Sequence, residues 1–187
     1  MHADTPTLLR NLASKNVGAQ VAIYETLTRR LAAAGAKCVV VTSIAGHFCI
    51  NEFKASSPLP VVDMISEVNS SIQQRGLKRI GILGTRAAME TGLYGGIPSA
   101  QIIPPSGRDL DRVHQAYIEM ASSGVATDAQ RQIFRDAIEK LLNEDKVEAI
   151  MLGGTDLALV FSEKDARFPL VDCAGIHADA VARLALR

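Results

Sequence analysis

Apolar residues alternate along the chain between a helical pattern and a strand-like pattern. Residues that recur every three or four positions indicate one face of a helix, whereas a short, almost wholly apolar run is typical of a buried parallel strand. The helical pattern predicts helices over residues 17–34, 64–74, 109–120, 128–142 and 176–186. The apolar runs predict strands over residues 37–42, 58–62, 78–83, 101–103, 146–152 and 168–171. Helices that alternate with strands predict an α/β fold.

The pattern also predicts which helix faces are buried and what joins the elements. In helix 109–120, Val113, Tyr117 and Met120 fall on one apolar stripe, and Asp128 is expected to cap the next helix. In helix 17–34 the apolar positions Val21, Ile23, Leu27, Leu31 and Ala32 recur near helical spacing, and Gly35 is expected to end the helix. We expect a loop with one short helix over residues 1–16, a loop and a helix over 43–56, a flexible glycine-rich connection over 92–98 and a helical turn over 157–161.

Three of the apolar runs stop at small or hydroxyl-bearing residues that lead into helix-compatible sequence. They stop at Ser43, at Gly84-Thr85 and at Gly153-Gly154-Thr155. A strand that turns into a helix in this way presents backbone N–H groups and hydroxyls to an anion. Because open α/β sheets bind ligands outside the carboxyl ends of their strands, we expect one shared cleft between two α/β lobes.

Composition narrows the classes of partner. The 187 residues can bury one substantial core or two small ones. Lys plus Arg and Asp plus Glu both number 20, and no run of like charges occurs, so the sequence indicates neither a nucleic-acid surface nor a membrane surface. A small molecule or a protein is the expected partner.

The cysteines and the apolar runs bear on the compartment. Cys38, Cys49 and Cys173 are odd in number and lack metal-type spacing, which favours reduced thiols over a disulfide framework or a metal site. No apolar run reaches the ~20 residues that span a bilayer, and the first residues lack the pattern of a signal peptide. The sequence therefore predicts a soluble, cytoplasmic protein with no metal.

Each candidate chemical residue has a structural alternative. Thr85 and Thr155 could contact a ligand or simply cap the turns that follow them. His47 lies one helical turn after Ser43 and could activate its hydroxyl as a base, or it could be an ordinary packed histidine. Arg86 could bind a carboxylate through its forked donors, or be solvated at a helix start. The residues alone leave these alternatives open.

Four segments, in order, resemble the aspartate/glutamate racemase family. Leu31–His47 is similar to the family's "RRLEAAGAD-hydrophobic-CNTAH" segment, and Gly81–Met89 is similar to "GLLGTRATM". Val147–Leu157 is similar to "AVILGCTEL", and Phe168–Ala180 is similar to "PVIDTTxIHAEA". The resemblance covers most of the chain, from about Leu27 to Leu186.

The resemblance implies a fold and a mechanism. The fold has two pseudo-symmetric three-layer α/β lobes with parallel sheets and a cleft between them, here residues 1–75 with 172–187, and 76–171. In the mechanism, one cysteine thiol removes the substrate's α-proton and a second returns a proton to the opposite face, without a cofactor. Family members often form dimers, so a homodimer is expected.

The chain departs from the family pattern at the residues that do the chemistry. The two cysteine positions fall on Ser43 and Gly154, and Ile44 and Ala45 replace the Asn and Thr that help to hold the substrate. A serine needs a neighbouring base to accept a proton, and glycine offers no side chain. The family's opening strand and "GGMGP"-like loop are also missing from the first lobe, so either the chain is truncated or that lobe is completed differently.

The matched residues nevertheless predict a function. Thr85, Arg86, Thr155 and His177 are expected to bind substrate, and Ser43, Gly154 and His47 occupy the catalytic positions. We expect a racemase-like protein that binds a small carboxylate, an acidic amino acid or a related diacid, between two lobes, without racemisation by two thiols. The alternatives are a non-catalytic ligand-binding or regulatory homologue and a lyase or decarboxylase variant.

Overall fold

The computed structural model describes residues 1–162 and 166–186, and the chain forms two compact units, Met1–Asp63 and Met64–Arg187. The sequence-based division instead groups residues 64–75 and 172–187 with the first lobe, and that grouping stays a prediction. No helix within the described residues combines the length and the apolar character that crossing a membrane requires.

The first unit is mostly helical and carries a small parallel sheet. Its elements are α1 (Thr5–Ala13), α2 (Val17–Ala33), β1 (Val39–Val40), η1 (Ala45–Cys49), α3 (Ile50–Ser56) and β2 (Val61–Val62). The predicted strands shorten to two residues each, and β1 pairs with β2 in parallel. The expected short helix near the start is α1, which Asp4 caps by accepting a hydrogen bond from the Thr7 N–H at 2.9 Å.

The predicted helix is α2, and its most buried face carries polar residues. Its buried residues are Gln20, Tyr24 and Thr28, whereas the predicted apolar positions are only half-buried: Val21, Ile23, Leu27, Leu31 and Ala32. Tyr24 sets this orientation, because its ring packs edge-on against Phe53 at 5.2 Å between ring centres, and its hydroxyl donates to the Gly46 carbonyl at 3.3 Å.

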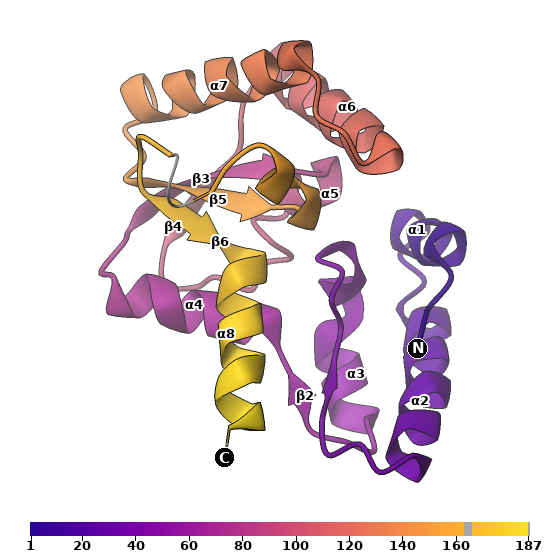
Figure 1. Ribbon diagram of the computed structural model, residues 1–187. Helices are drawn as coiled ribbons and strands as arrows, with labels where there is room; N and C mark the ends of the chain where they lie inside the picture. The colour runs from indigo at the N-terminus through magenta and orange to yellow at the C-terminus, as the bar shows by residue number, and fades with distance from the viewer. Residues whose placement is uncertain (163–165, 187) are drawn as a thin grey trace. The chain divides into compact units, whose positions relative to one another are not determined.

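The second unit contains a four-stranded parallel sheet between helices. Its elements are α4 (Met64–Gln74), β3 (Arg79–Gly84), α5 (Arg86–Glu90), β4 (Gln101–Ile103), α6 (Gly107–Ser123), α7 (Asp128–Asn143), β5 (Ala149–Gly153), η2 (Thr155–Leu159), β6 (Leu170–Asp172) and α8 (Cys173–Ala185). The strand order is β4-β3-β5-β6, with every pairing parallel. Helices α6 and α7 cover one face of this sheet, and α4 and α8 cover the other (Figure 1). The predicted α/β class with parallel sheets is confirmed.

Burial in the second unit follows the sequence pattern closely. Every residue of β3 after Arg79 and every residue of β5 is buried, as expected for strands covered on both faces. On α6 the predicted stripe of Val113, Tyr117 and Met120 is buried. One cap was wrong, because Thr127, not Asp128, caps α7, and it forms a capping box with Gln130.

Two glycines allow the ends of the central strands to approach closely. Gly84 of β3 is paired in register with Gly153 of β5. A Cβ on Gly84 would lie 2.5 Å from the Gly153 carbonyl oxygen, and a Cβ on Gly153 would lie 2.8 Å from the Leu83 carbonyl oxygen. Because the obstructing atoms belong to the backbone, a side chain at either position would push the strands apart.

We expect Gly84→Ala to lower the free energy of unfolding by about 1–3 kcal/mol, the usual range for an overpacked site. The matched control is Gly18→Ala within α2, where a new Cβ would meet no atom within 4 Å. That control should leave stability unchanged or raise it by up to about 1 kcal/mol. Urea denaturation followed by circular dichroism measures both. An unchanged midpoint for Gly84→Ala would contradict the packing described.

Candidate functional site

The candidate site of the second unit is built at the carboxyl ends of β3 and β5. Because Gly84 and Gly153 are in register, Thr85 and Gly154 leave the sheet at the same edge, followed by Thr155. This is the edge at which parallel α/β sheets bind ligands. The structure thus brings together three of the residues selected from the sequence: Thr85, Gly154 and Thr155.

Thr85 has the structural role that the sequence left open, and its hydroxyl can also act as a donor. It caps α5, since its Oγ1 accepts a hydrogen bond from the Ala88 N–H at 3.2 Å. A hydroxyl that accepts one bond still has a hydrogen to donate. Capping and ligand contact by Thr85 are therefore compatible.

A left-handed turn follows α5, where the sequence had indicated a flexible connection. Gly92, Leu93, Tyr94 and Gly95 have φ values of 59°, 58°, 59° and 69°. The left-handed conformation costs roughly 1–2 kcal/mol for each residue other than glycine. The turn is nevertheless ordered by hydrogen bonds, including Tyr94 N–H to Thr91 Oγ1 at 2.8 Å and Gly95 N–H to the Thr91 carbonyl at 2.8 Å.

This turn places a second hydroxyl at the edge. Leu93 is fully buried beneath it, and the Tyr94 hydroxyl is shielded from solvent near Thr85. Burial raises the pKa of Tyr94 to about 12, although the Thr85 hydroxyl partly opposes the shift. The sequence analysis missed Tyr94, and the flanking glycines were the available signal for a special backbone conformation.

Arg86 is engaged by carboxylates of the protein itself. Its guanidinium donates to Asp111 and, at 3.0 Å, to Glu90, and these two carboxylates raise the pKa of Arg86. Its backbone N–H donates to His114 Nδ1 at 3.1 Å. Burial, followed by the charge of Arg86, lowers the pKa of His114. A ligand carboxylate at Arg86 would have to compete with Asp111 and Glu90.

The space that a side chain at position 154 would fill is occupied by Tyr117 of α6. A Cβ on Gly154 would lie 2.5 Å from Tyr117 Cζ and 2.6 Å from Tyr117 Oη. These distances are far below van der Waals contact, so only glycine fits while the ring is in place. The phenol therefore stands beside β5 where the family resemblance implies a cysteine.

The Tyr117 hydroxyl belongs to a small polar cluster with η2. It donates to Asp156 Oδ2 at 3.0 Å, and Thr155 Oγ1 lies 3.4 Å from the same oxygen. Burial raises the pKa of Tyr117, and the Asp156 carboxylate raises it further. Tyr117 is therefore a protonated phenol at neutral pH, held in one orientation by a carboxylate. Sequence analysis assigned it only to the apolar stripe of its helix.

In the first unit, His47 contacts Ser43 through the main chain. His47 is 1% exposed, and its Nδ1 lies 2.9 Å from the Ser43 carbonyl oxygen. Since a carbonyl can only accept, Nδ1 carries the hydrogen. This hydrogen bond fixes the ring in its helix and does not involve the Ser43 hydroxyl, so base activation of Ser43 stays a prediction.

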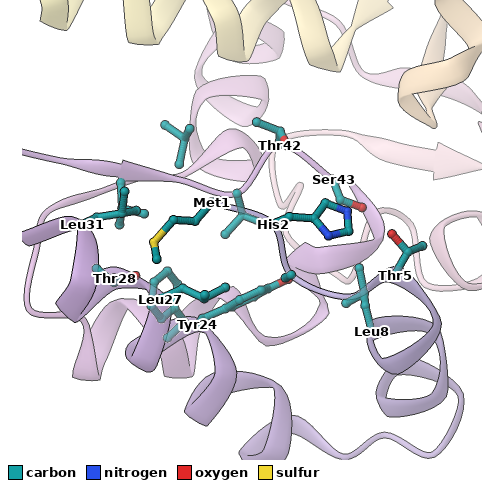
Figure 2. Close-up of a pocket in the computed structure, with 15 residues that line it drawn as sticks. Met1, His2, Thr5, Leu8, Tyr24, Leu27, Thr28, Leu31, Thr42 and Ser43 are labelled. Carbon is teal, nitrogen blue, oxygen red and sulfur yellow. The ribbon is translucent and has the colours of Figure 1, made fainter. Parts of the chain in front are cut away.

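Ser43 also lines a cavity of about 240 Å³ within the first unit. The walls come from α2, β1 and the residues on either side of them, and Figure 2 shows Met1 and His2 lying across this cavity with Tyr24, Leu27 and Thr28. Its lining is largely apolar, with several hydroxyl groups and the His2 imidazole as the polar groups.

The remaining predicted residue, His177, lies on α8 of the second unit and is buried. Asp172 caps that helix by accepting from the Gly175 N–H at 3.0 Å.

Across the described part of the chain, no three His, Cys, Asp or Glu side chains gather closely enough to hold a metal ion.

The two buried thiols are not activated by their surroundings. Cys49 and Cys173 are fully buried, whereas Cys38 is half-buried. Burial raises the pKa of Cys49 to about 12 and also raises the pKa of Cys173. Both are therefore neutral thiols at physiological pH, and the thiolate is the reactive form.

Gly154→Ala should lower the free energy of unfolding by about 1–3 kcal/mol, because the new methyl group meets the Tyr117 ring. In a Tyr117→Leu background, in which a shorter side chain replaces the ring, Gly154→Ala should lower the free energy of unfolding much less. A double-mutant cycle by urea denaturation should give a coupling energy of at least about 1 kcal/mol. Additive effects of the two substitutions would refute this contact.

Thiol labelling at pH 8 should find one fast-reacting cysteine per native chain and all three after denaturation. At this pH the buried Cys49 and Cys173 remain protonated, because pH 8 lies below their raised pKa values. Cys38→Ser should abolish the fast phase. The measurement is release of thionitrobenzoate, and two or more fast thiols would show that a buried cysteine is activated.

Comparison with known proteins identifies the family of this chain. The family model for Asp/Glu/Hydantoin racemase matches residues 1–181. A glutamate racemase from Aquifex aeolicus (strain VF5) is 24% identical over 129 residues, which are 67% of this chain and 48% of that protein. The chain thus spans about half the length of this curated relative.

Two solved structures have a similar fold. A candidate Asp/Glu racemase from Yersinia pestis superimposes with a TM-score of 0.85 and 28% identity, over 99% of this chain and 82% of that one. An aspartate racemase homologue from Pyrococcus horikoshii OT3 gives a TM-score of 0.79 and 22% identity, over 89% and 74% of the respective chains. The chain therefore belongs to the Asp/Glu/Hydantoin racemase family.

Proposed function

We propose that this protein binds a small carboxylate, an acidic amino acid or a related diacid, and does not racemise it through two thiols. The observation that carries the second part is the Tyr117 ring in the space of a residue-154 side chain. Neither a thiol nor any other side chain fits there while the ring is present. The neutral state of the two buried cysteines supports the same conclusion.

Family membership and the set of hydroxyls at the strand ends support carboxylate binding. Thr85, Tyr94, Thr155 and Tyr117, which we call the edge hydroxyls, surround the ends of two adjacent strands. Hydroxyl groups and backbone N–H groups are suitable donors to a carboxylate. By the family resemblance, Ser43, His47 and His177 are further proposed contacts of the same ligand. Arg86 is also a proposed contact, but its guanidinium must first release Asp111 or Glu90.

Two other functions are compatible with the Tyr117 ring beside Gly154 and with the edge hydroxyls. A non-catalytic ligand-binding or regulatory protein would need the edge hydroxyls and no thiol. A lyase or decarboxylase needs only one group to protonate an enolate-like intermediate, and the Tyr117 hydroxyl is such a group.

We also propose that the protein is a cytoplasmic homodimer. The three unpaired cysteines favour a reducing compartment.

Aspartate, glutamate or a related diacid should raise the melting temperature of the full chain, because a ligand that binds only the folded state stabilises it by RT ln(1 + [L]/Kd). The ligand should be recovered without inversion of its configuration. Differential scanning fluorimetry with both enantiomers of each amino acid, followed by chiral chromatography, measures both parts. A neutral control such as an amino-acid amide should give a smaller shift.

Absence of stabilisation by every acidic ligand would overturn carboxylate binding. Inversion at a rate lost in Cys38→Ser would show that a thiol does take part, and would overturn the second part of the proposal.

A further inference from the structure

We propose that the hydroxyl of Tyr117, oriented by Asp156, transfers protons to and from one face of the bound carboxylate's α-carbon. The inference rests on the proposed function, because a carboxylate must first bind at this edge. Three observations support it. The Tyr117 ring occupies the space beside Gly154, the Tyr117 hydroxyl is hydrogen-bonded to Asp156, and Gly154 follows the end of β5.

The position of the Tyr117 ring places a hydroxyl beside residue 154, which is a glycine and has no side chain of its own. Gly154 leaves the end of β5 without a side chain, and Tyr117 Oη lies 2.6 Å from the point where a Cβ would begin. The hydroxyl therefore projects at the carboxyl edge of the sheet from a helix that covers one of its faces. Substitution of Gly154 by a larger residue would displace this hydroxyl.

Asp156 controls both the orientation and the acidity of the phenol. The Tyr117 hydroxyl donates to Asp156 Oδ2 at 3.0 Å, which fixes the direction of its O–H bond. Within the described chain, Asp156 of η2 is the charged group that acts on Tyr117, and the Thr155 hydroxyl is its other polar neighbour. The buried neighbours of Tyr117 on α6 are the apolar Val113, Ala116 and Met120, and the titratable His114, one turn before Tyr117, accepts from the Arg86 N–H at 3.1 Å.

The proposed step balances without a cofactor. The phenolate form of Tyr117, whose proton has gone to solvent, takes the α-hydrogen as a proton, and the C–H electron pair becomes the C=C bond of an enediolate. In D₂O the resulting O–H exchanges to O–D, and Tyr117 returns the deuteron to the same carbon. One hydroxyl returns the proton to the face from which it came, so C–H becomes C–D with retained configuration.

The raised pKa of Tyr117 predicts how the rate depends on pH. The phenolate is the proton acceptor, and both burial and Asp156 disfavour it, so the exchange rate should still rise with pH above pH 10. Asp156→Asn removes the neighbouring negative charge and should lower the pKa of Tyr117. The rate profile of this variant should therefore shift to lower pH, an effect that loss of packing alone would not produce.

The test follows α-hydrogen exchange of L- and D-aspartate and L- and D-glutamate in D₂O by proton NMR, with configuration checked by chiral chromatography. Wild type should exchange with retention. Tyr117→Phe, which keeps the ring and removes only the hydroxyl, should slow exchange by about 100-fold or more. Ser122→Ala, on the same helix, removes an exposed hydroxyl that donates to the Ile118 carbonyl at 2.7 Å and serves as the matched control, with exchange at the wild-type rate.

The outcomes separate this inference from the proposed function. Ligand-dependent stabilisation without any exchange, exchange with inversion, or wild-type exchange by Tyr117→Phe would each overturn the role of Tyr117. No stabilisation by any acidic ligand would overturn carboxylate binding, and this inference with it. If Tyr117→Phe were to fold poorly by circular dichroism, an unshifted rate profile for Asp156→Asn would still contradict the inference.

Discussion

The pairing of β3 with β5 determines where the groups of the candidate site lie. Gly84 and Gly153 stand opposite each other, and each would bring a Cβ against a carbonyl oxygen of the facing strand. Because both lack side chains, the strand ends stay in register up to the last residue. Thr85 and Gly154 then leave the sheet at the same level, and α5 and η2 begin at the next residues, Arg86 and Thr155. A displacement of either strand end would separate the edge hydroxyls from one another.

The Tyr117 ring occupies the space that a side chain at Gly154 would fill. Removing a side chain from a packed site normally leaves a cavity that lowers stability, but here an aromatic ring occupies the space. Burying a phenol requires a hydrogen-bond partner, since an unsatisfied hydroxyl away from water costs roughly 1–3 kcal/mol. Asp156 is that partner. The glycine, the tyrosine and the aspartate are thus mutually dependent, and the packing that excludes a thiol also delivers a hydroxyl.

Local patterns in the sequence predicted most of the second unit but little of its site. Strand 78–83 and the stripe through Val113, Tyr117 and Met120 follow from burial periodicity, which acts over a few neighbouring residues. The contact between Tyr117 and Gly154 joins residues far apart in the chain, so no local pattern contains it. The error at Thr127 has a different cause, because adjacent Thr and Asp are both good caps and backbone geometry decides between them.

In the first unit, packing overrode the local pattern. The apolar spacing of α2 predicted the helix but not its most buried face, because Tyr24 turns the helix so that polar Gln20 and Thr28 are buried. A single aromatic contact with Phe53 and a hydrogen bond to Gly46 outweigh several half-buried aliphatic residues. The two-residue strands of this unit also show why the apolar run at 37–42 overestimated β1, since a strand extends only as far as a neighbour pairs with it.

The distribution of charge at the edge constrains how a carboxylate can lie there. Asp156 sits beside Thr155 and Tyr117, and a second carboxylate placed against it would be repelled. Thr85 and Tyr94, on the β3 side, have no acidic neighbour of that kind among the contacts described, and the Thr85 hydroxyl has a hydrogen to donate. For the carboxylate ligand that we propose, electrostatics therefore favour a carboxylate on the β3 side, which would turn its α-carbon toward the hydroxyl beside β5. The left-handed turn that carries Tyr94 fits this proposal, because it adds a buried hydroxyl on the side without a neighbouring carboxylate.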